Sequence, residues 1–406
     1  MIPPTLRSLS PDVGEAYDTT TPSFANYLNE VEEWYSGQAD TYEILDREAR
    51  ADEGSPGSFG FRIALKIAES RRLLAALDQQ VTITLVNPVY KETGRILPRS
   101  EHPHGEDSIR VKAESLLAIE GLNPGRLRCR LVVVDDECPA GSGELAAEIL
   151  RADYPQRWDD GSFGVFSLRD AIDGGDSDTP PGLTHKDGAN RSVKGGALLF
   201  GMKKALHHQS GGLHVVVDND ADLSIHPMQL GLLVDPIASG SVQAVAGSRR
   251  EEDSVALIGG SRDTRGQLFI KIWQHFLPAL AGRVTDTNRA FKAFNAEALQ
   301  EIIDGIEIYT FPYQIELLQA CISNGIALQK RGIAYVDSEA ASTQQGEGIT
   351  ETYLNQVRQI IDIAQRYKAI PSDDPLLRFF EEVSEERWAE IEAAPPEDLG
   401  DLLRVE

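Results

Sequence analysis

Four short apolar runs, each ending abruptly at polar residues, constrain the fold of this 406-residue chain more than any other feature. Short runs rich in β-branched residues are typical of strands buried on both faces of a parallel sheet. Helical patterns separate the runs, which predicts βαβ units and an α/β fold with a mostly parallel central sheet. In such a sheet the ligand binds at the carboxyl ends of the strands. The runs are Val81–Val86, Leu131–Val134, Leu213–Val217 and Val242–Ala246, and the helical patterns are Ile109–Ile119, Gly143–Arg151 and Gly195–His207.

The charge balance excludes several classes of partner, because the formal net charge is −25. A nucleic-acid-binding protein carries a basic footprint, so we expect no nucleic-acid partner, and an anionic membrane surface would repel the chain. No apolar run approaches the ~18–20 residues of a membrane span. The three cysteines form no metal-binding or disulfide pattern. We therefore expect a cytoplasmic protein without a membrane partner, which can form a homo-oligomer.

The segments on either side of the strand-containing region have a different pattern. The first is polar and mixed, with helical patterns near Phe24–Tyr35 and Phe61–Leu77. The last is acidic and helical in pattern. The sequence therefore predicts a core domain with a helical extension at each end. The expected divisions are 1–80 for the N-terminal extension, 81–345 for the core domain and 346–406 for the C-terminal extension.

The strongest chemical signal follows the third strand run. Asp218, Asp220 and Asp222 stand two residues apart, directly after the run. Carboxylate oxygens are ligands suited to Mg²⁺ or Mn²⁺, and Mg²⁺ typically takes one or two of them and fills its sphere with water and substrate phosphates. The same spacing is also typical of an Asx turn that caps a helix starting near His226. Asp135-Asp136 follows the second run, where a carboxylate can accept hydrogen bonds from a base or a ribose, or form an ordinary turn.

Taken in order, these turns resemble those of the family 2 nucleotide-sugar glycosyltransferases with the GT-A fold. The similarity is greatest to the dolichyl-phosphate mannose and glucose synthase branch, and it covers about residues 81–340. The metal motif of that branch, Asp-Ala-Asp-Leu-x-x-x-Pro, is present in full. The matching segments are Asn87–Glu92, Val134–Cys138, Lys194–Met202, Asp220–Pro227, Gly247–Arg249, Thr264–Gly266, Asp286–Lys292 and Tyr313–Glu316.

The resemblance implies a role for each matching residue. Asp220 and Asp222 would hold Mg²⁺ or Mn²⁺ on the diphosphate of a UDP- or GDP-linked sugar, where the metal acts as a Lewis acid. Asp222 would thereby serve catalysis, and Glu316 is the carboxylate nominated as a base. The remaining residues implied to contact the nucleotide sugar are Pro88, Tyr90, Glu92, Asp136, Lys194, Arg249 and Arg265.

Some positions depart from the family pattern. Glu137-Cys138 replaces a Gly-Ser pair, Ser224 stands where a Gln metal ligand is common, and the 91–108 loop is longer than usual. We expect no apolar anchor after the core domain. These departures count against a polyprenyl-phosphate acceptor.

The resemblance implies an inverting, metal-dependent glycosyltransferase, and we expect a small, water-soluble acceptor, such as one from antibiotic-type specialised metabolism. Aromatic residues Tyr309, Phe311 and Tyr313 are expected to line its pocket or to pack in the core, and His102 and His104 can reach it from the 91–108 loop. Three alternatives remain at this point: a polyprenyl-phosphate glycosyltransferase, a sugar-1-phosphate nucleotidyltransferase and a non-catalytic sugar-nucleotide-binding protein.

Overall fold

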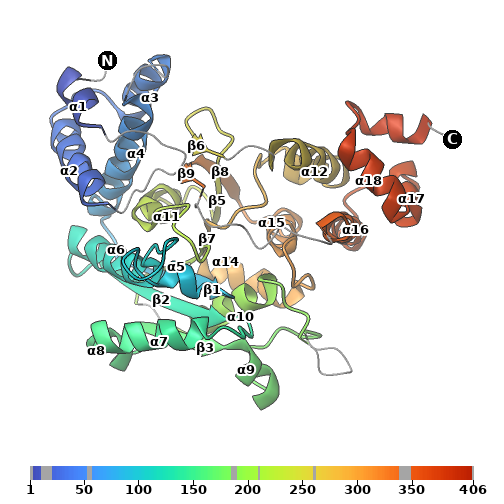
Figure 1. The fold of residues 1–406 in the computed structure, drawn as a ribbon, viewed down its shortest axis with the longest axis horizontal. Coiled ribbons are helices and arrows are strands. Elements are labelled where there is room, and N and C mark those ends of the chain that lie inside the picture. Colours follow the sequence, from blue (N-terminus) through green and yellow to red (C-terminus); the bar gives the residue numbers. More distant parts are fainter. Residues whose placement is uncertain are drawn as a thin grey trace.

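A computed structural model describes residues 3–10, 21–52, 57–183, 190–208, 211–258, 262–337 and 349–404, with the backbone alone described at 262–265, 349–351 and 404. The strands are β1 Val81–Val89, β2 Leu127–Asp135, β3 Phe163–Ser167, β4 Leu213–Asp218, β5 Ala244–Ser248, β6 Val255–Leu257, β7 Lys292–Asn295, β8 Leu328–Gly332 and β9 Ala334–Val336. Seven of them form one sheet in the order β3-β2-β1-β4-β7-β5-β8, and β6 pairs with β9 (Figure 1). Only β7 runs antiparallel to its neighbours. The predicted α/β fold with a mostly parallel sheet is confirmed.

All four predicted strand runs are strands of this sheet, as β1, β2, β4 and β5. Strand β1 continues through Pro88 instead of stopping there, and pairs with β2 as far as Val89. Strand β4 pairs with β1 only to Val86, so Pro88 lies beyond the β4 ladder, where a missing N–H breaks no hydrogen bond. The edge strand β3 was not predicted, because it is short, half-buried and interrupted by Gly164.

Helices cover both faces of the sheet. Side chains of alternate strand residues lie on opposite faces of the sheet. Leu85 and Val217 belong to the core cluster on one face, and Val86 and Val216 to the cluster on the other. The first face is covered by α4 Ser58–Ala75, α6 Ser108–Leu122, α7 Ser142–Asp153 and α11 Leu230–Ala238, and the second by α10 Gly195–Leu206, α12 Arg262–Phe276, α14 Ala296–Ile302 and α15 Tyr313–Ser323.

The N-terminal segment joins the first face through α4. Helices α1 Pro4–Leu9, α2 Pro22–Ser36 and α3 Tyr42–Ala51 pack on α4, and α3 was not predicted. The hydroxyl of Ser70 donates to the Met228 carbonyl at 2.6 Å and accepts from the Gly231 N–H at 2.8 Å. The buried Lys66 ammonium lies 3.0 Å from both Asp253 and the Gly332 carbonyl. Helix α4 therefore shares its core with the sheet.

The C-terminal segment packs beside α12 and α15 (Figure 1). It contains α16 Ile349–Arg366, α17 Pro375–Glu382, α18 Glu385–Ala393 and the 3₁₀ helix η3 Leu399–Arg404, as its helical pattern predicts. Within the described residues, no helix is both long and apolar enough to cross a membrane. Short elements complete the fold: α5 Thr93–Ile96, α8 Pro155–Asp159, α9 Leu168–Gly174, η1 Pro227–Gln229, α13 Pro278–Ala281 and η2 Ile303–Gly305.

Candidate active site

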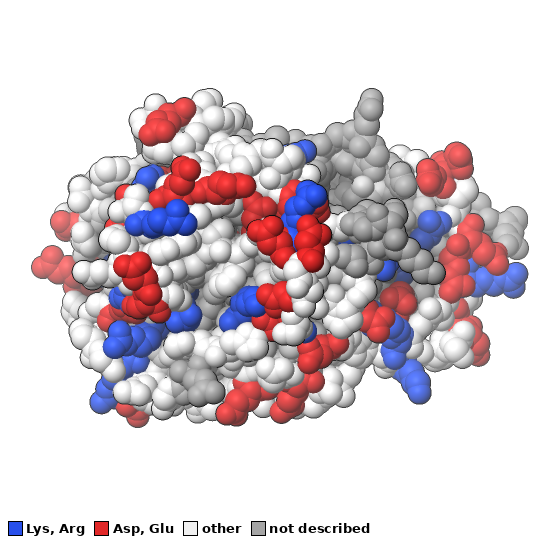
Figure 2. Space-filling view, turned by 90° about the horizontal axis from the view of Figure 1, so that it is seen from below, with Lys and Arg blue, Asp and Glu red and all other residues white. Residues whose placement is uncertain are grey.

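A cavity of about 1690 Å³ opens at the carboxyl ends of β1, β2, β4 and β5. Its position agrees with the rule that ligands bind at the carboxyl ends of parallel strands. Acidic and basic side chains are interspersed on the face of the molecule in Figure 2, where the acidic ones cover more of the surface. The cavity brings together eight of the sequence-predicted site residues: Pro88, Tyr90, Glu92, Asp136, Lys194, Asp220, Asp222 and Arg249.

The three aspartates after β4 differ in their surroundings. Asp218 is fully buried and accepts hydrogen bonds from the Lys292 N–H at 2.5 Å and the Tyr313 hydroxyl at 3.0 Å, so it holds the strand end in place. Asp220 lines the cavity and forms an ion pair with the Lys194 ammonium. Burial acts to raise the pKa of Asp220, but Lys194 and then Arg289 outweigh it and lower that pKa to about 2. Asp222 lines the cavity two residues further on.

Hydrogen bonds from α6 and from the segment before it fix the loop that carries the aspartates. The buried Lys112 ammonium donates to the carbonyls of Ala221 and Asp222 at 2.7 and 3.1 Å. Burial lowers the pKa of Lys112 to about 8. The Glu106 carboxylate accepts from the Leu223 N–H at 2.8 Å. These contacts fix the backbone of the loop and leave its carboxylates directed to the cavity.

The Asp135-Asp136 pair divides into a carboxylate with both oxygens engaged and one with a single oxygen engaged. Asp135 accepts from the N–H groups of Cys138 at 2.7 Å and Gly143 at 2.8 Å, and thereby shapes the turn before α7. Asp136 accepts from the Lys194 N–H at 2.7 Å through Oδ2, while its buried Oδ1 has no partner. Burial raises the pKa of Asp136. Glu137, at the family's glycine position, adopts a left-handed backbone with φ of 59°, so the turn survives without the glycine that this conformation favours.

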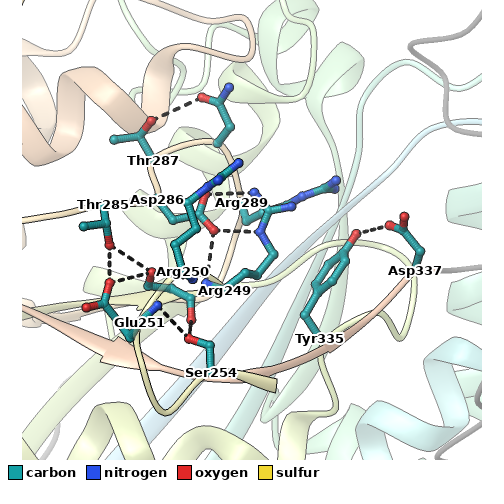
Figure 3. Close-up of polar contacts among 12 residues, drawn as sticks. Arg249, Arg250, Glu251, Ser254, Thr285, Asp286, Thr287, Arg289, Tyr335 and Asp337 are labelled. Carbon is teal, nitrogen blue, oxygen red and sulfur yellow. Dashed lines mark hydrogen bonds and ion pairs between the residues drawn. The ribbon is translucent and has the colours of Figure 1, made fainter. Parts of the chain in front are cut away.

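Two guanidinium groups and an aromatic ring, those of Arg249, Arg289 and Tyr335, lie close together (Figure 3), and all three residues line the cavity. Arg249 makes a bidentate pair with the buried Asp286, at 2.6 and 2.9 Å. Burial acts to raise the pKa of Asp286, but Arg249 lowers it to about 2. The guanidinium carbons of Arg249 and Arg289 lie 5.1 and 5.0 Å from the centre of the Tyr335 ring, within the range of cation–π attraction. The Tyr335 hydroxyl donates to Asp337 at 2.5 Å.

The predicted base does not lie on the cavity wall. Glu316 is fully buried on α15, where it accepts from the N–H of Ile308 at 2.7 Å and forms an ion pair of 2.6 Å with Arg366 of α16. Burial raises the pKa of Glu316. Because its oxygens are engaged by these donors and by the Glu307 N–H, the carboxylate acts as a structural acceptor between two helices.

Of the other residues predicted to contact the acceptor, some line the cavity and some do not. Phe311 lines the cavity, whereas Tyr309 bonds to the Pro181 carbonyl and Tyr313 to Asp218 inside the core. His102 and His104 pack beside each other outside the set of cavity-lining residues. The side chain of Arg265 lies outside the described residues, although the next residue, Gly266, reaches the cavity.

Several cavity residues were missed by the sequence analysis. Arg95 pairs with Glu92 at 2.5 Å on the floor near β1. Arg289 and Tyr335 stand in segments that carry no strand-end signal of their own. Tyr353 and Gln356 come from α16, in the predicted C-terminal extension. Arg289 lies inside the matching segment Asp286–Lys292. Its positive charge within that segment was the one sequence feature that could have identified it as a site residue.

The sheet, the acidic pair after a buried strand and the unpartnered Asp136 oxygen agree with the GT-A arrangement that the sequence predicts. No protein-family model matches the chain. Over 223 residues it is 26% identical to a polyprenol monophosphomannose synthase of Mycolicibacterium smegmatis, a match that covers 54% of this chain and 72% of that protein. The chain is thus similar to glycosyltransferase family 2 and distantly related to that synthase.

Solved structures were also found to be similar. The glucosyl-3-phosphoglycerate synthase of Mycobacterium tuberculosis, in complex with Mn²⁺, uridine diphosphate and glucosyl-3-phosphoglycerate, has a TM-score of 0.46 and 17% identity, covering 76% of this chain and 85% of that one. The mannosyl-3-phosphoglycerate synthase of Rubrobacter xylanophilus has a TM-score of 0.46 and 16% identity, covering 78% and 82%.

Proposed function

We propose that this chain is a metal-dependent glycosyltransferase that moves a sugar from a UDP- or GDP-linked donor to a small, water-soluble acceptor. The observation that carries the proposal is the position of Asp220 and Asp222 on one cavity wall, beside the unpartnered Oδ1 of Asp136. The mycobacterial relative is named for a sugar transfer, which supports the same class of reaction. That the reaction belongs to specialised metabolism remains an expectation from the sequence.

The carboxylate ligands at this site suit a hard divalent cation that also binds a diphosphate. Within the described residues, no group of three or more His, Cys, Asp and Glu side chains could enclose a metal, and Mg²⁺ bound to a phosphate substrate needs only one or two carboxylates. Asp220 and Asp222 would supply them. The cation, when bound, neutralises charge on the departing nucleotide diphosphate. Lys194, released from Asp220, would then pair with a phosphate oxygen.

The remaining residues would bind and orient the donor. Oδ1 of Asp136 would accept a hydrogen bond from the ribose or the base, and the half-exposed Tyr90 ring at the rim offers a stacking surface. Arg289 lines the same cavity as the acidic pair, interacts electrostatically with Asp220 and Asp222, and would hold phosphate oxygens. We propose transfer with inversion at the anomeric carbon, which the anomeric configuration of the product, read by NMR, would test.

A polyprenyl phosphate is the second candidate acceptor, because it is favoured by the name of the mycobacterial relative. A nucleotidyltransferase receives less support, since the turn after β1 reads Asn87-Pro88-Val89-Tyr90 and lacks a glycine-rich phosphate loop. Side-by-side assays with polyprenyl phosphate and with soluble alcohols, thiols and phosphates would separate the two acceptors.

The first test is donor binding. We expect UDP- or GDP-sugars with Mn²⁺ to raise the thermal unfolding midpoint, because a ligand at about 100 times its Kd stabilises the folded state by about 2.7 kcal/mol. EDTA should remove the shift and stop turnover. If no nucleotide sugar raises the midpoint and turnover persists in EDTA, the proposal is wrong.

A further inference from the structure

We propose that α16 of the C-terminal segment forms the acceptor-binding wall, and that Tyr353 and Gln356 select a neutral, hydroxyl-bearing small molecule such as a sugar or polyol. This inference rests on the proposed glycosyl transfer and goes beyond it, because it names the acceptor class. It also assigns a substrate-binding role to a helix outside the region that resembles family 2.

Helix α16 is fixed to the domain by buried polar contacts as well as by its apolar face. Arg366 pairs with the fully buried Glu316 of α15 at 2.6 Å. Near the middle of the helix, Gln359 accepts a hydrogen bond from the Thr310 hydroxyl at 2.7 Å. Leu354 and Val357 are buried in the core cluster of the second sheet face. The helix therefore has one position relative to the cavity.

Two residues of this helix reach the cavity from one face. Tyr353 and Gln356 are three residues apart, which places them on neighbouring turns of the same side, and both line the cavity. Gln356 is 5% exposed, and its buried Nε2 has no hydrogen-bond partner. A buried amide without a partner is costly, so a ligand oxygen that accepts from Nε2 would relieve that cost.

The α16 wall is continuous with the metal-binding side. Thr310, held by Gln359, precedes Phe311, whose ring lies 6.0 Å from the Lys194 ammonium. The Val193 N–H donates to the Tyr309 carbonyl at 2.9 Å, which joins the Val193-Lys194 segment to the same loop. An acceptor resting on α16 would therefore lie beside the donor sugar at the acidic pair.

The charge on this wall argues for a neutral ligand. Its cavity-lining groups are the rings of Phe311 and Tyr353, the Gln356 amide, the exposed Val193 side chain and Gln314, whose amide already bonds to Lys292 and Tyr313. The adjacent ammonium, that of Lys194, is paired with Asp220 and would pair with a donor phosphate oxygen once a metal binds, so its charge is compensated in either case. The guanidinium group of Arg249 is paired with Asp286, and that of Arg289 lies against the Tyr335 ring. Aromatic rings that cover C–H faces, with amides that bond hydroxyls, suit a sugar or polyol.

The test is transfer to matched acceptors. Purified protein with its UDP- or GDP-sugar donor and Mn²⁺ is offered neutral sugars and polyols and, separately, their phosphate esters, and product is measured by mass spectrometry. We expect a neutral member to have the higher kcat/KM. Gln356→Met should raise the acceptor KM about tenfold through the lost hydrogen bond, and Tyr353→Ala should do likewise. The donor KM should stay within about twofold.

Gln365→Met is the matched control, because Gln365 is exposed on the same helix and bonds to Glu381 at 2.9 Å, away from the cavity. It should change neither KM. Gln356→Asn, which keeps a shorter amide, should recover part of the loss and guards against misfolding of the first variant. Preference for the phosphate esters, no transfer to any neutral acceptor despite donor binding, or equal effects of Gln356→Met and Gln365→Met would overturn the inference. Absence of donor binding in the wild type would instead refute the proposed function.

Discussion

The two sides of the cavity are built in different ways. The acidic side is assembled from the residues that follow β2 and β4, so each functional group is joined to a buried strand by one to four peptide bonds. The α16 side is assembled from a loop before α10, a loop before α15 and a helix near the C-terminus, which meet only through tertiary contacts. The first side would supply charge for the proposed metal and diphosphate, whereas the second presents rings and amides.

This difference in construction explains what the sequence could and could not predict. Asp136, Asp220 and Asp222 could be predicted to lie together at one edge of the sheet because a buried strand fixes where the following side chains lie. Glu316 was assigned to the site from a short motif, and its position depends on Arg366, fifty residues later in the chain. No local pattern encodes that pair. Gln356 had no signal at all, because nothing in a helical pattern tells which polar residue faces a cavity.

The largest expected effect concerns the acidic side. Asp222→Asn keeps the shape of the side chain and removes the charge that would hold the metal. A metal that stabilises developing charge is worth several kcal/mol, so we expect turnover to fall by about 10²–10³-fold or more, and Asp220→Asn to behave alike. Steady-state assays with saturating Mn²⁺ would measure this.

The control for that experiment is Asp373→Asn, since Asp373 is an exposed carboxylate between α16 and α17. It should leave turnover unchanged, and all three variants should show wild-type circular dichroism. If Asp222→Asn retained more than about a tenth of the activity, the acidic side would have to be reassigned to a structural turn.

An intermediate effect is expected for Glu316→Gln, which tests whether this carboxylate is structural. The substitution removes one partner of the buried ion pair with Arg366, while Gln can still accept from the Ile308 N–H. Hydrogen bonds to charged groups contribute about 1.5–3 kcal/mol, so we expect a loss of stability of that order in urea unfolding. Turnover should fall less than tenfold. A loss of 10²–10⁴-fold, as for a general base, would return Glu316 to the active site.

The smallest expected effect on turnover concerns the amino end of β4, opposite the acidic side. His214 is buried there and lies 2.9 Å from the Thr84 hydroxyl. Burial, with smaller contributions from His208 and Arg130, lowers the pKa of His214 to about 4. The imidazole is therefore neutral in the folded protein at pH 7. Because the unfolded chain binds this proton more readily, the stabilising contribution is complete above about pH 6.5 and is lost as the pH falls toward 4.

Substituting His214→Gln removes the titrating group and keeps a polar partner for Thr84. The unfolding free energy of the wild type should then fall more steeply between pH 7 and pH 4.5 than that of the variant, by up to roughly 2 kcal/mol over the interval. Turnover at pH 7 should stay within about twofold, because the residue lies at the end of β4 that does not face the cavity. Urea unfolding at each pH, with turnover measured on the same samples, separates the two readouts. Parallel pH profiles for the two proteins would mean that His214 is already accessible to protons in the folded state, and a large loss of turnover would mean that the amino end of β4 influences the acidic pair through the strand.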